Sequence, residues 1–140
     1  MKTSSQKKQS MDWACLNKYA IENQNLSNVS NQDRIVLMGD SITEFWKTTD
    51  NTFFQNTTLI NRGISGQTTS QMLLRFRQDA INLKPEIIVI LAGINDIAEN
   101  TGPISLENIF GNILSMVELA KTNNIKIVLS SVLPANKFPW

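Results

Sequence analysis

Three short polar segments follow apolar runs, and the first could carry a nucleophile. It is Gly39-Asp40-Ser41, which comes directly after the apolar residues 35–38. A serine at a turn from a strand into a helix has its hydroxyl near a helix N-terminus, where developing negative charge is favoured. That position suits a nucleophile whose attack creates an oxyanion. Asp and Ser are also the most common N-cap residues, so taken alone these residues are more typical of a plain helix start.

The other two segments could supply hydrogen-bond donors to an oxyanion. Gly66 follows Ser65 in a loop with two glycines, and a glycine lets a backbone N–H approach a ligand closely. Asn95 stands two residues after Gly93, and its side-chain NH₂ is a further donor. The alternatives are a turn glycine and an Asx-turn asparagine. Asp96 is expected to cap or brace its loop rather than to react.

Strands that alternate with helices must position these loops. Four short apolar runs predict strands of a parallel sheet, and the strongest of them are apolar on both faces. These runs are residues 34–38, 58–61, 86–92 and 125–132. Two helices lie between them: one begins at the capping-box residues 68–71 and is stopped by Pro85, and the other opens at Ser105. Loops after parallel strands meet at one edge of the sheet, so the three polar segments should converge.

Each predicted helix has an apolar stripe that is expected to face the core. The stripe of the first helix is Met72, Leu73, Phe76, Ala80 and Leu83. That of the second is Leu106, Ile109, Phe110, Ile113, Leu114 and Val117. A further amphipathic helix over residues 11–25 is expected to dock through Trp13, Leu16, Ala20 and Ile21, and residues 27–33 are expected to be a connector.

Together the three loops resemble the SGNH (GDSL-type) esterase and acylhydrolase family. The matching blocks are Gly39-Asp40-Ser41-Ile42-Thr43-Glu44, Asn61-Arg62-Gly63-Ile64-Ser65-Gly66-Gln67-Thr68 and Gly93-Ile94-Asn95-Asp96. The match runs from about Arg34 to the C-terminus, in the order and with the spacing of the family. We therefore expect residues 34–140 to form a partial family domain, preceded by a tail and docking helix in residues 1–33. Phe45 departs from the family pattern, where Gly is frequent, and would narrow the pocket mouth.

The resemblance implies a fold and a mechanism. The fold would be a flavodoxin-like three-layer α/β/α sandwich with a parallel sheet, here without its last strand and helix. Ser41 would be the nucleophile, and the oxyanion hole would consist of the N–H of Ser41, the N–H of Gly66 and the side chain of Asn95. Asp40 and Asp96 would support these loops. Family members cleave carboxylic esters such as lysophospholipids, acetylated sugars and thioesters without a metal or cofactor, so a small-molecule ester is the expected partner.

The family's fourth block is an Asp-x-x-His whose histidine is the general base, and this chain contains no histidine. A serine hydroxyl is a poor nucleophile at neutral pH without an adjacent base. Asp40 and Asp96 are poor substitutes, because an ordinary Asp pKa near 4 makes a weak base. We therefore interpret the chain as a truncated member with at most about 10³–10⁴-fold catalysis over water. The strand at 125–132 would then be an exposed apolar edge prone to self-association.

Composition argues against several other classes of protein. Thirteen Lys and Arg against twelve Asp and Glu leave a net charge of +1, which disfavours nucleic-acid binding. The longest apolar run, residues 87–92, is far below the about 18 residues of a membrane span. Residues 1–10 lack the apolar core of a secretory signal, so a cytoplasmic location is the default expectation. One cysteine, Cys15, excludes an internal disulfide and a Cys-based zinc site, and the composition leaves the oligomeric state open.

Two other hypotheses stay open at this level. One is a non-enzymatic α/β module, either a receiver-like phosphoacceptor or a nucleotide-binding domain. Asp40 and Asp96 at strand ends favour it, since carboxylates there can hold Mg²⁺. Neither Gly-x-Gly-x-x-Gly nor Gly-x-x-x-x-Gly-Lys-Ser/Thr is present, which counts against nucleotide binding. The other hypothesis is an inactive remnant that only binds or has no activity.

Overall fold

Four parallel strands form one sheet in the order β2-β1-β3-β4. The computed structural model describes residues 12–27, 33–55, 58–135 and 137–138, and every statement below concerns these residues. The strands are β1 (Ile35–Gly39), β2 (Leu59–Gly63), β3 (Ile87–Leu91) and β4 (Lys126–Leu129). The four predicted strands are confirmed, and β4 is shorter than the apolar run that predicted it.

The register of the sheet aligns the carboxyl ends of β1, β2 and β3. Gly39, the last residue of β1, lies opposite Gly63 of β2 on one side and Leu91 of β3 on the other. The loops after these strands therefore leave the sheet at the same height and at neighbouring positions. This is the convergence that a parallel sheet requires of its carboxyl edge.

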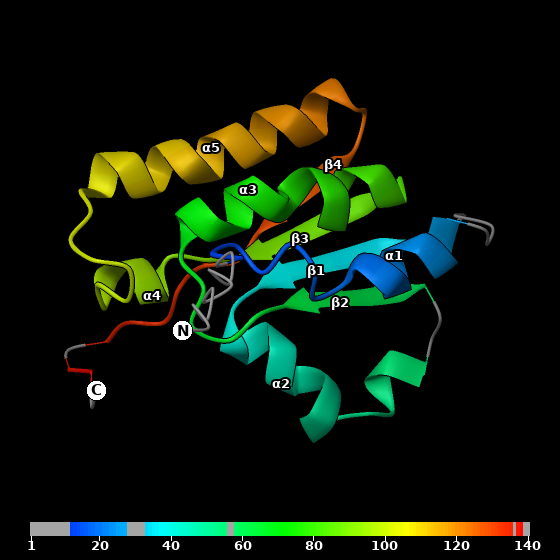
Figure 1. Ribbon diagram of the computed structural model, residues 1–140, viewed down its shortest axis with the longest axis horizontal. Helices are drawn as coiled ribbons and strands as arrows, with labels where there is room; N and C mark the ends of the chain where they lie inside the picture. The colour runs from blue at the N-terminus through cyan, green and yellow to red at the C-terminus, as the bar shows by residue number, and fades with distance from the viewer. Residues whose placement is uncertain (1–11, 28–32, 56–57, 136, 139–140) are drawn as a thin grey trace, which may run out of the picture.

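Helices cover both faces of the sheet and complete the predicted three-layer α/β/α arrangement (Figure 1). On one face α3 (Thr69–Asp79) and α5 (Leu106–Thr122) pack against each other, and α1 (Ala20–Ser27) lies beside α3. On the other face α2 (Ser41–Thr49) packs on β2 and β1. The short elements are α4 (Ile94–Ile97) after β3 and the 3₁₀ turns η1 (Phe53–Gln55) and η2 (Ile81–Leu83).

The apolar core lies between the sheet and the layer of α3 and α5. Alternate residues of the strands point to this side, which is the period-two pattern of a pleated strand. The core comprises Val36, Met38, Ile60, Ile88 and Ile90 from the strands, with Met72, Phe76, Ala80, Met116 and Ala120 from the helices. The predicted stripe of α3 is confirmed, since four of its members are buried and Leu73 packs against them.

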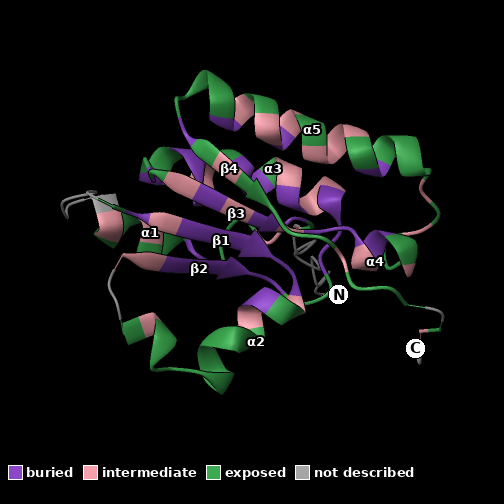
Figure 2. Cartoon of the chain, turned by 180° about the vertical axis from the view of Figure 1, so that it is seen from behind, coloured by how far each residue is buried: buried purple, intermediate pink, exposed green. Residues whose placement is uncertain are grey.

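The predicted stripe of α5 is partly wrong. Ile109 is buried as expected, but Leu106, Phe110 and Leu114 are exposed, and Met116 and Ala120 are buried in their place (Figure 2). The apolar stripe is wider than the surface that α3 and β4 offer, so the helix buries only the edge of the stripe that faces them.

The predicted N-terminal helix is also partly wrong. The helix begins at Ala20, and residues 12–19 form turns. Asp12 explains this, because its carboxylate accepts the backbone N–H groups of Leu16 (2.8 Å) and Asn17 (2.9 Å), which a helix would leave to backbone carbonyls. Leu16 is exposed, as are Trp13 and Ile21, and the buried members of this segment are Ala14 and Tyr19. The predicted tail and connector fall mostly on residues 1–11 and 28–32, outside the described part.

The second face of the sheet is covered unequally. α2 lies over β1 and β2, whereas Val89 and Leu91 of β3 are half-buried. β4 is the edge strand of the described sheet, as expected, and its Val128 and Leu129 are 49% and 55% exposed. Of the helices in the described ranges, none combines the length and apolar character that crossing a membrane requires.

Candidate active site

Ser41 is the first residue of α2 and follows β1 after one residue. Asp40 is the N-cap of this helix, and its Oδ1 accepts the N–H of Ile42 at 3.0 Å. The helix-start role that the sequence allowed for these residues is therefore filled by Asp40, which leaves the Ser41 side chain outside the cap. Ser41 is half-buried. Its N–H belongs to the first helical turn, where amides have no acceptor within the helix.

The Asp40 carboxylate is only half satisfied. The residue is fully buried, and its Oδ2 has no hydrogen-bond partner among the described residues. Burial raises the pKa of the Asp40 carboxyl, the bond from Ile42 opposes this, and the charge of Asp96 adds to the rise. Ionising this carboxyl beside the proposed nucleophile therefore costs stability.

The loop after β2 carries Gly66 at a backbone conformation that requires glycine. Its φ is +75°, which residues with a Cβ rarely adopt. Three hydrogen bonds fix the loop. The N–H of Ile64 donates to the carbonyl of Gly39 (3.0 Å), the N–H of Ser65 donates to the Glu44 carboxylate (2.6 Å), and Asn100 Nδ2 donates to the carbonyl of Gly66 (3.2 Å). The loop is therefore tied to β1, α2 and the segment after α4.

Asn95 connects the third loop to the second. It is buried in α4, and its Nδ2 donates to the carbonyl of Gln67 at 3.0 Å, while its Oδ1 accepts from Asn100 at 3.0 Å. The side chain therefore does not close its own loop as an Asx turn would. An amide nitrogen carries two hydrogens, so the bond to Gln67 leaves one for another acceptor.

Asp96 lies next to Asn95 and holds the start of α3. Both of its carboxylate oxygens accept the N–H of Thr69 (2.8 and 3.1 Å), and Oδ1 also accepts the Thr69 hydroxyl (2.5 Å). Both oxygens are thus committed to a helix start, where backbone N–H groups favour negative charge. This is a bracing role rather than a reacting one.

The first turn of α2 sits directly on the ends of β1 and β2. A Cβ at Gly63 would lie 2.2 Å from the backbone nitrogen of Glu44, and a Cβ at Gly39 would lie 2.1 Å from Thr43 Oγ1. The contact at Gly63 is with backbone, which cannot move aside as a side chain can. Glycine at this position therefore sets how closely the helix that begins with Ser41 approaches the second loop.

The role of a buried arginine behind the site, Arg75, was not predicted from the sequence. Arg75 is completely buried in α3. Its Nη2 donates to the carbonyls of Arg62 (2.8 Å) and Gly39 (3.3 Å), its Nε donates to Gln67 Oε1 (2.6 Å), and its Nη1 pairs with Asp79 (3.2 Å). The guanidinium therefore ties the ends of β1 and β2 to the loop and to α3. A sequence signal existed, because Arg75 and Asp79 stand four residues apart on the apolar stripe of the helix.

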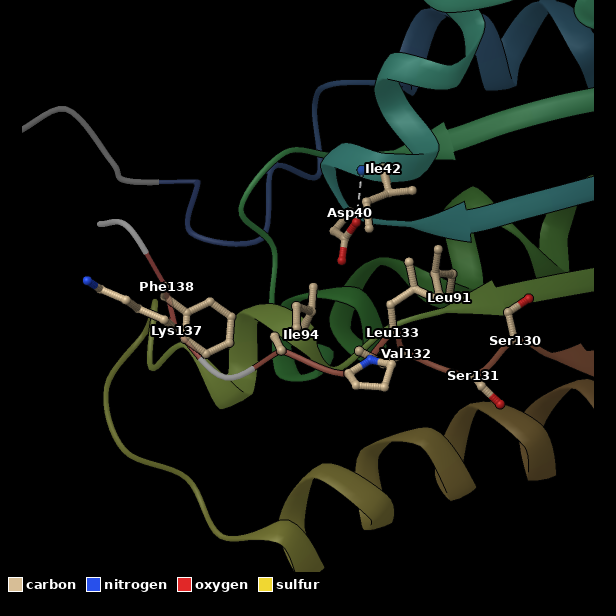
Figure 3. A pocket seen from close by; sticks show the side chains of 12 residues that line it. Asp40, Ile42, Leu91, Ile94, Ser130, Ser131, Val132, Leu133, Lys137 and Phe138 are labelled. Atoms are coloured by element: carbon tan, nitrogen blue, oxygen red, sulfur yellow. Dashed lines mark hydrogen bonds between the residues drawn. The ribbon is translucent and has the colours of Figure 1, made fainter.

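A mostly apolar pocket of about 390 Å³ opens beside the start of α2 (Figure 3). Asp40 and Ile42 form one wall, Leu91 and Ile94 form the base, and residues 130–135, 137 and 138 form the opposite wall. Figure 3 shows the Asp40 carboxylate on the wall that faces this last segment. No group of three or more His, Cys, Asp or Glu side chains suited to a metal ion occurs within the described residues.

The parallel sandwich and its three joined loops define an α/β protein with a polar site at the carboxyl edge of the sheet. The chain belongs to the GDSL-like lipase/acylhydrolase family, whose model matches residues 37–140. The expected family and fold class are confirmed by this match and by the solved structures described next.

Two Bacteroides structures are similar over nearly the whole chain. A candidate acylhydrolase from Bacteroides fragilis NCTC 9343 is 53% identical with a TM-score of 0.88, covering 93% of this chain and 63% of its own. A GDSL-like lipase from Bacteroides thetaiotaomicron VPI-5482 is 55% identical with a TM-score of 0.86, covering 91% of this chain and 62% of its own. The chain thus spans less than two thirds of the length of these relatives.

More distant similarities are shorter or concern the fold alone. The uncharacterized lipoprotein YqeF of Bacillus subtilis (strain 168) is 33% identical over 82 residues, which are 56% of this chain and 34% of that protein. A catalytic mutant of Axe2, an acetylxylan esterase from Geobacillus stearothermophilus, has a TM-score of 0.60 at 21% identity and covers 72% of this chain and 60% of its own.

Proposed function

We propose that this site hydrolyses carboxylic esters. Ser41 is the nucleophile, and the oxyanion is bound by the backbone N–H of Ser41, the backbone N–H of Gly66 and the side-chain amide of Asn95. The observation that carries the proposal is the 3.0 Å bond from Asn95 Nδ2 to the carbonyl of Gln67. It joins the carboxamide to the loop of Gly66, which in turn is bonded to β1 through Ile64 and Gly39 (3.0 Å).

The chemistry of each group follows from its position. Ser41 Oγ attacks the ester carbonyl carbon, its proton passes to water, and the carbonyl electron pair moves to oxygen. A proton from water is taken up by the leaving oxygen when the alcohol departs. Amides at the start of α2 and in the glycine loop, with the Asn95 carboxamide, stabilise that negative oxygen. Collapse of the intermediate expels the alcohol and leaves an acyl-serine, which water hydrolyses to the acid and free Ser41.

The proton of Ser41 needs an acceptor that these residues do not provide. The 140 residues contain no histidine, and both oxygens of Asp96 are bonded to Thr69. Asp40 carries an unpartnered Oδ2, but a carboxylate is a weak base for a hydroxyl. Slow turnover, at most about 10³–10⁴-fold over water, is therefore proposed for this chain by itself.

The apolar pocket supports an ester with an uncharged group next to the carbonyl. Ile42, Leu91 and Ile94 line it, and an acyl or alkyl chain would remove this surface from water. Ser41 itself does not line the pocket but stands in the chain between two residues that do, Asp40 and Ile42. Lysophospholipase-like and acetylesterase-like substrates both satisfy this condition. A cytoplasmic location and the absence of a nucleic-acid partner stay proposals as well.

A fluorophosphonate probe tests for an activated serine, with p-nitrophenyl acetate hydrolysis as the second assay. We expect slow labelling of Ser41, because no adjacent base activates it, and slow ester hydrolysis, both abolished by Ser41→Ala. Ser115→Ala is the matched control, because that hydroxyl bonds the carbonyl of Gly111 (2.8 Å) in α5, away from the site. Labelling that persists in Ser41→Ala, or none in the folded wild-type chain, would contradict the proposal. Rapid turnover that depends on Ser41 would contradict only the argument about the missing base.

The receiver-like alternative predicts Mg²⁺-dependent phosphorylation of an aspartate by acetyl phosphate. It requires carboxylate oxygens that are available to a cation. Asp40 Oδ2 has no hydrogen-bond partner among the described residues, but both oxygens of Asp96 accept hydrogen bonds from Thr69, so the two carboxylates do not present a pair of open oxygens. The arrangement therefore favours ester hydrolysis.

A further inference from the structure

The Glu44 side chain joins three parts of the chain that are distant in sequence. It stands in the first turn of α2, three residues after Ser41. One carboxylate oxygen, Oε2, accepts the N–H of Ser65 at 2.6 Å, and the other, Oε1, accepts a hydrogen bond from Lys18 Nζ. A single carboxylate therefore bridges the helix of Ser41, the loop of Gly66 and the N-terminal segment, defined here as residues 12–27.

The bond to Ser65 acts directly on the orientation of the next amide. The Gly66 N–H belongs to the peptide group that links Ser65 to Gly66, so its direction depends on where Ser65 is held. Glu44 fixes the amide before this peptide, and Asn100 fixes the carbonyl after it (3.2 Å). The peptide between these two anchors has little freedom to rotate, and Gly66 keeps its φ of +75°.

Glu44 is charged under ordinary conditions. Partial burial raises the pKa of its carboxyl, but the bonds from Lys18 and Ser65 lower it further, so the pKa lies below its usual value. A hydrogen bond to an ionised acceptor is shorter and stronger than one between neutral groups. The Ser65 amide is therefore held by a charge-assisted bond.

The N-terminal segment contacts the same loop on both sides of Gly66. Before it, Tyr19 Oη donates to the carbonyl of Gly63 at 2.5 Å. After it, Gln67 Nε2 donates to the carbonyl of Ala14 at 2.8 Å. The turns of residues 12–19 thus place Lys18 above Glu44 while they hold both ends of the loop.

We propose that Glu44 is a positioning residue for the oxyanion loop, with Lys18 as its partner. Acting through Ser65, the pair directs the Gly66 N–H toward the oxygen that forms when Ser41 attacks. The proposal rests on the ester hydrolase function given above, and neither side chain touches the substrate. An exposed ion pair that only adds stability is the competing explanation.

The test uses Glu44→Ala, Glu44→Gln and Lys18→Met in the full chain. The matched control is Glu86→Ala, which removes another exposed carboxylate–lysine pair, Glu86 with Lys126 (2.8 Å), at the opposite end of β3 and β4. Amide hydrogen exchange at Ser65 and Gly66, measured by NMR, shows how firmly the Ser65 amide is held and does not depend on activity. Single-turnover acylation of Ser41 by p-nitrophenyl acetate gives the rate at saturation and the apparent KM.

We expect Glu44→Ala to exchange the Ser65 amide at least about tenfold faster and to acylate about tenfold more slowly, with KM within about twofold. Misplacing a catalytic group by a fraction of an ångström has an effect of this order. Glu44→Gln keeps an acceptor oxygen and should recover most of both losses. The exchange and acylation rates of Lys18→Met should lie between those of Glu44→Gln and Glu44→Ala. Those of Glu86→Ala should match the wild type.

Two results would overturn the positioning role. One is exchange at Ser65 and Gly66 in Glu44→Ala that is no faster than in Glu86→Ala. The other is an acylation rate that stays at the wild-type value although exchange accelerates. Should Glu44→Ala fail to fold, Glu44→Gln and Lys18→Met carry the comparison. Failure of the ester hydrolase function would appear separately, as acylation that Ser41→Ala does not change, and the exchange data would then still decide whether Glu44 anchors the loop.

Discussion

The carboxamide of Asn95 donates a hydrogen bond of 3.0 Å to the backbone carbonyl of Gln67, and both residues are buried. The bond crosses from the loop after β3 to the loop after β2, which are 28 residues apart. A buried polar side chain without a partner would be destabilising, so this pairing fixes Asn95 in one orientation. The same side chain accepts from Asn100, whose amide also reaches Gly66 (3.2 Å). The two loops therefore behave as one unit.

Replacing Asp96 by Asn should destabilise the protein by about 1–3 kcal/mol, because the buried N–H and hydroxyl of Thr69 lose charge-assisted bonds. Urea unfolding of the variant and the wild type measures this difference. Asp50→Asn is the control, since Asp50 is exposed and accepts from Thr52 and Phe53 at the surface. Equal midpoints for Asp96→Asn and wild type would contradict the bracing role.

Gly63→Ala should cost about 3 kcal/mol or more, or prevent folding, because its Cβ would overlap the backbone of Glu44 at 2.2 Å. Gly111→Ala is the opposite case: no atom lies within 4 Å of the added Cβ, and alanine favours the helix interior. That variant should gain about 0.5–1 kcal/mol. Thermal unfolding of the two variants tests both the predicted loss and the predicted gain in stability. A small loss in Gly63→Ala would mean that α2 can move away from β2.

Tyr19 should titrate with a pKa of about 12, because burial disfavours the phenolate and the charge of Glu44 adds to this. The chain has one tyrosine, so ultraviolet titration reports this residue alone. The folded pKa lies above the ordinary value of 10.0, so the phenol's contribution to stability is complete below that pH and is lost as pH rises toward about 12. Tyr19→Phe should remove this alkaline loss, and a midpoint near 10 would contradict the buried contact with Gly63.

The free energy of unfolding of Asp40→Asn should increase relative to that of the wild type as pH rises. Burial raises the folded pKa of Asp40, so its contribution is fully present below the unfolded pKa and is lost as pH rises through the folded value. Asparagine can still accept the N–H of Ile42 as an N-cap and does not titrate. Unfolding free energies of both proteins, measured from acidic to neutral pH, should diverge, whereas parallel curves would show that the Asp40 carboxyl titrates normally.

The elements that sequence predicts well are those set by local pattern. The strands are predictable because residues such as Val36 and Ile88 belong to short apolar runs. The loops after them are predictable because glycine and polar residues end those runs. The parallel topology then determines which loops meet. Of the proposed site residues, Gly66 lies in a loop, whereas Ser41 begins α2 and Asn95 lies in the short helix α4, each just after a strand.

The features that sequence missed depend on partners from other elements. Arg75 stands on the apolar stripe of α3, but the groups that it binds at Gly39, Arg62 and Gln67 come from outside the helix, so the helix pattern alone does not reveal them. Which residues of α5 are buried depends on how much surface its neighbours α3 and β4 offer. The spacing of apolar residues along the helix carries no information about that surface. The Lys18–Glu44 pair joins residues that are 26 apart in the sequence. Lys18 lies in turns that are stabilised by hydrogen bonds to the Asp12 carboxylate.

The N-terminal segment leaves the ribosome before every group that it holds. Lys18 and Tyr19 are synthesised ahead of Glu44 and Gly63, so the Lys18 contact can form only after α2 has been made and the Tyr19 contact only after β2 has been made. During translation this segment is therefore made before its partners, and it can hold both of them only after residue 63 has been added.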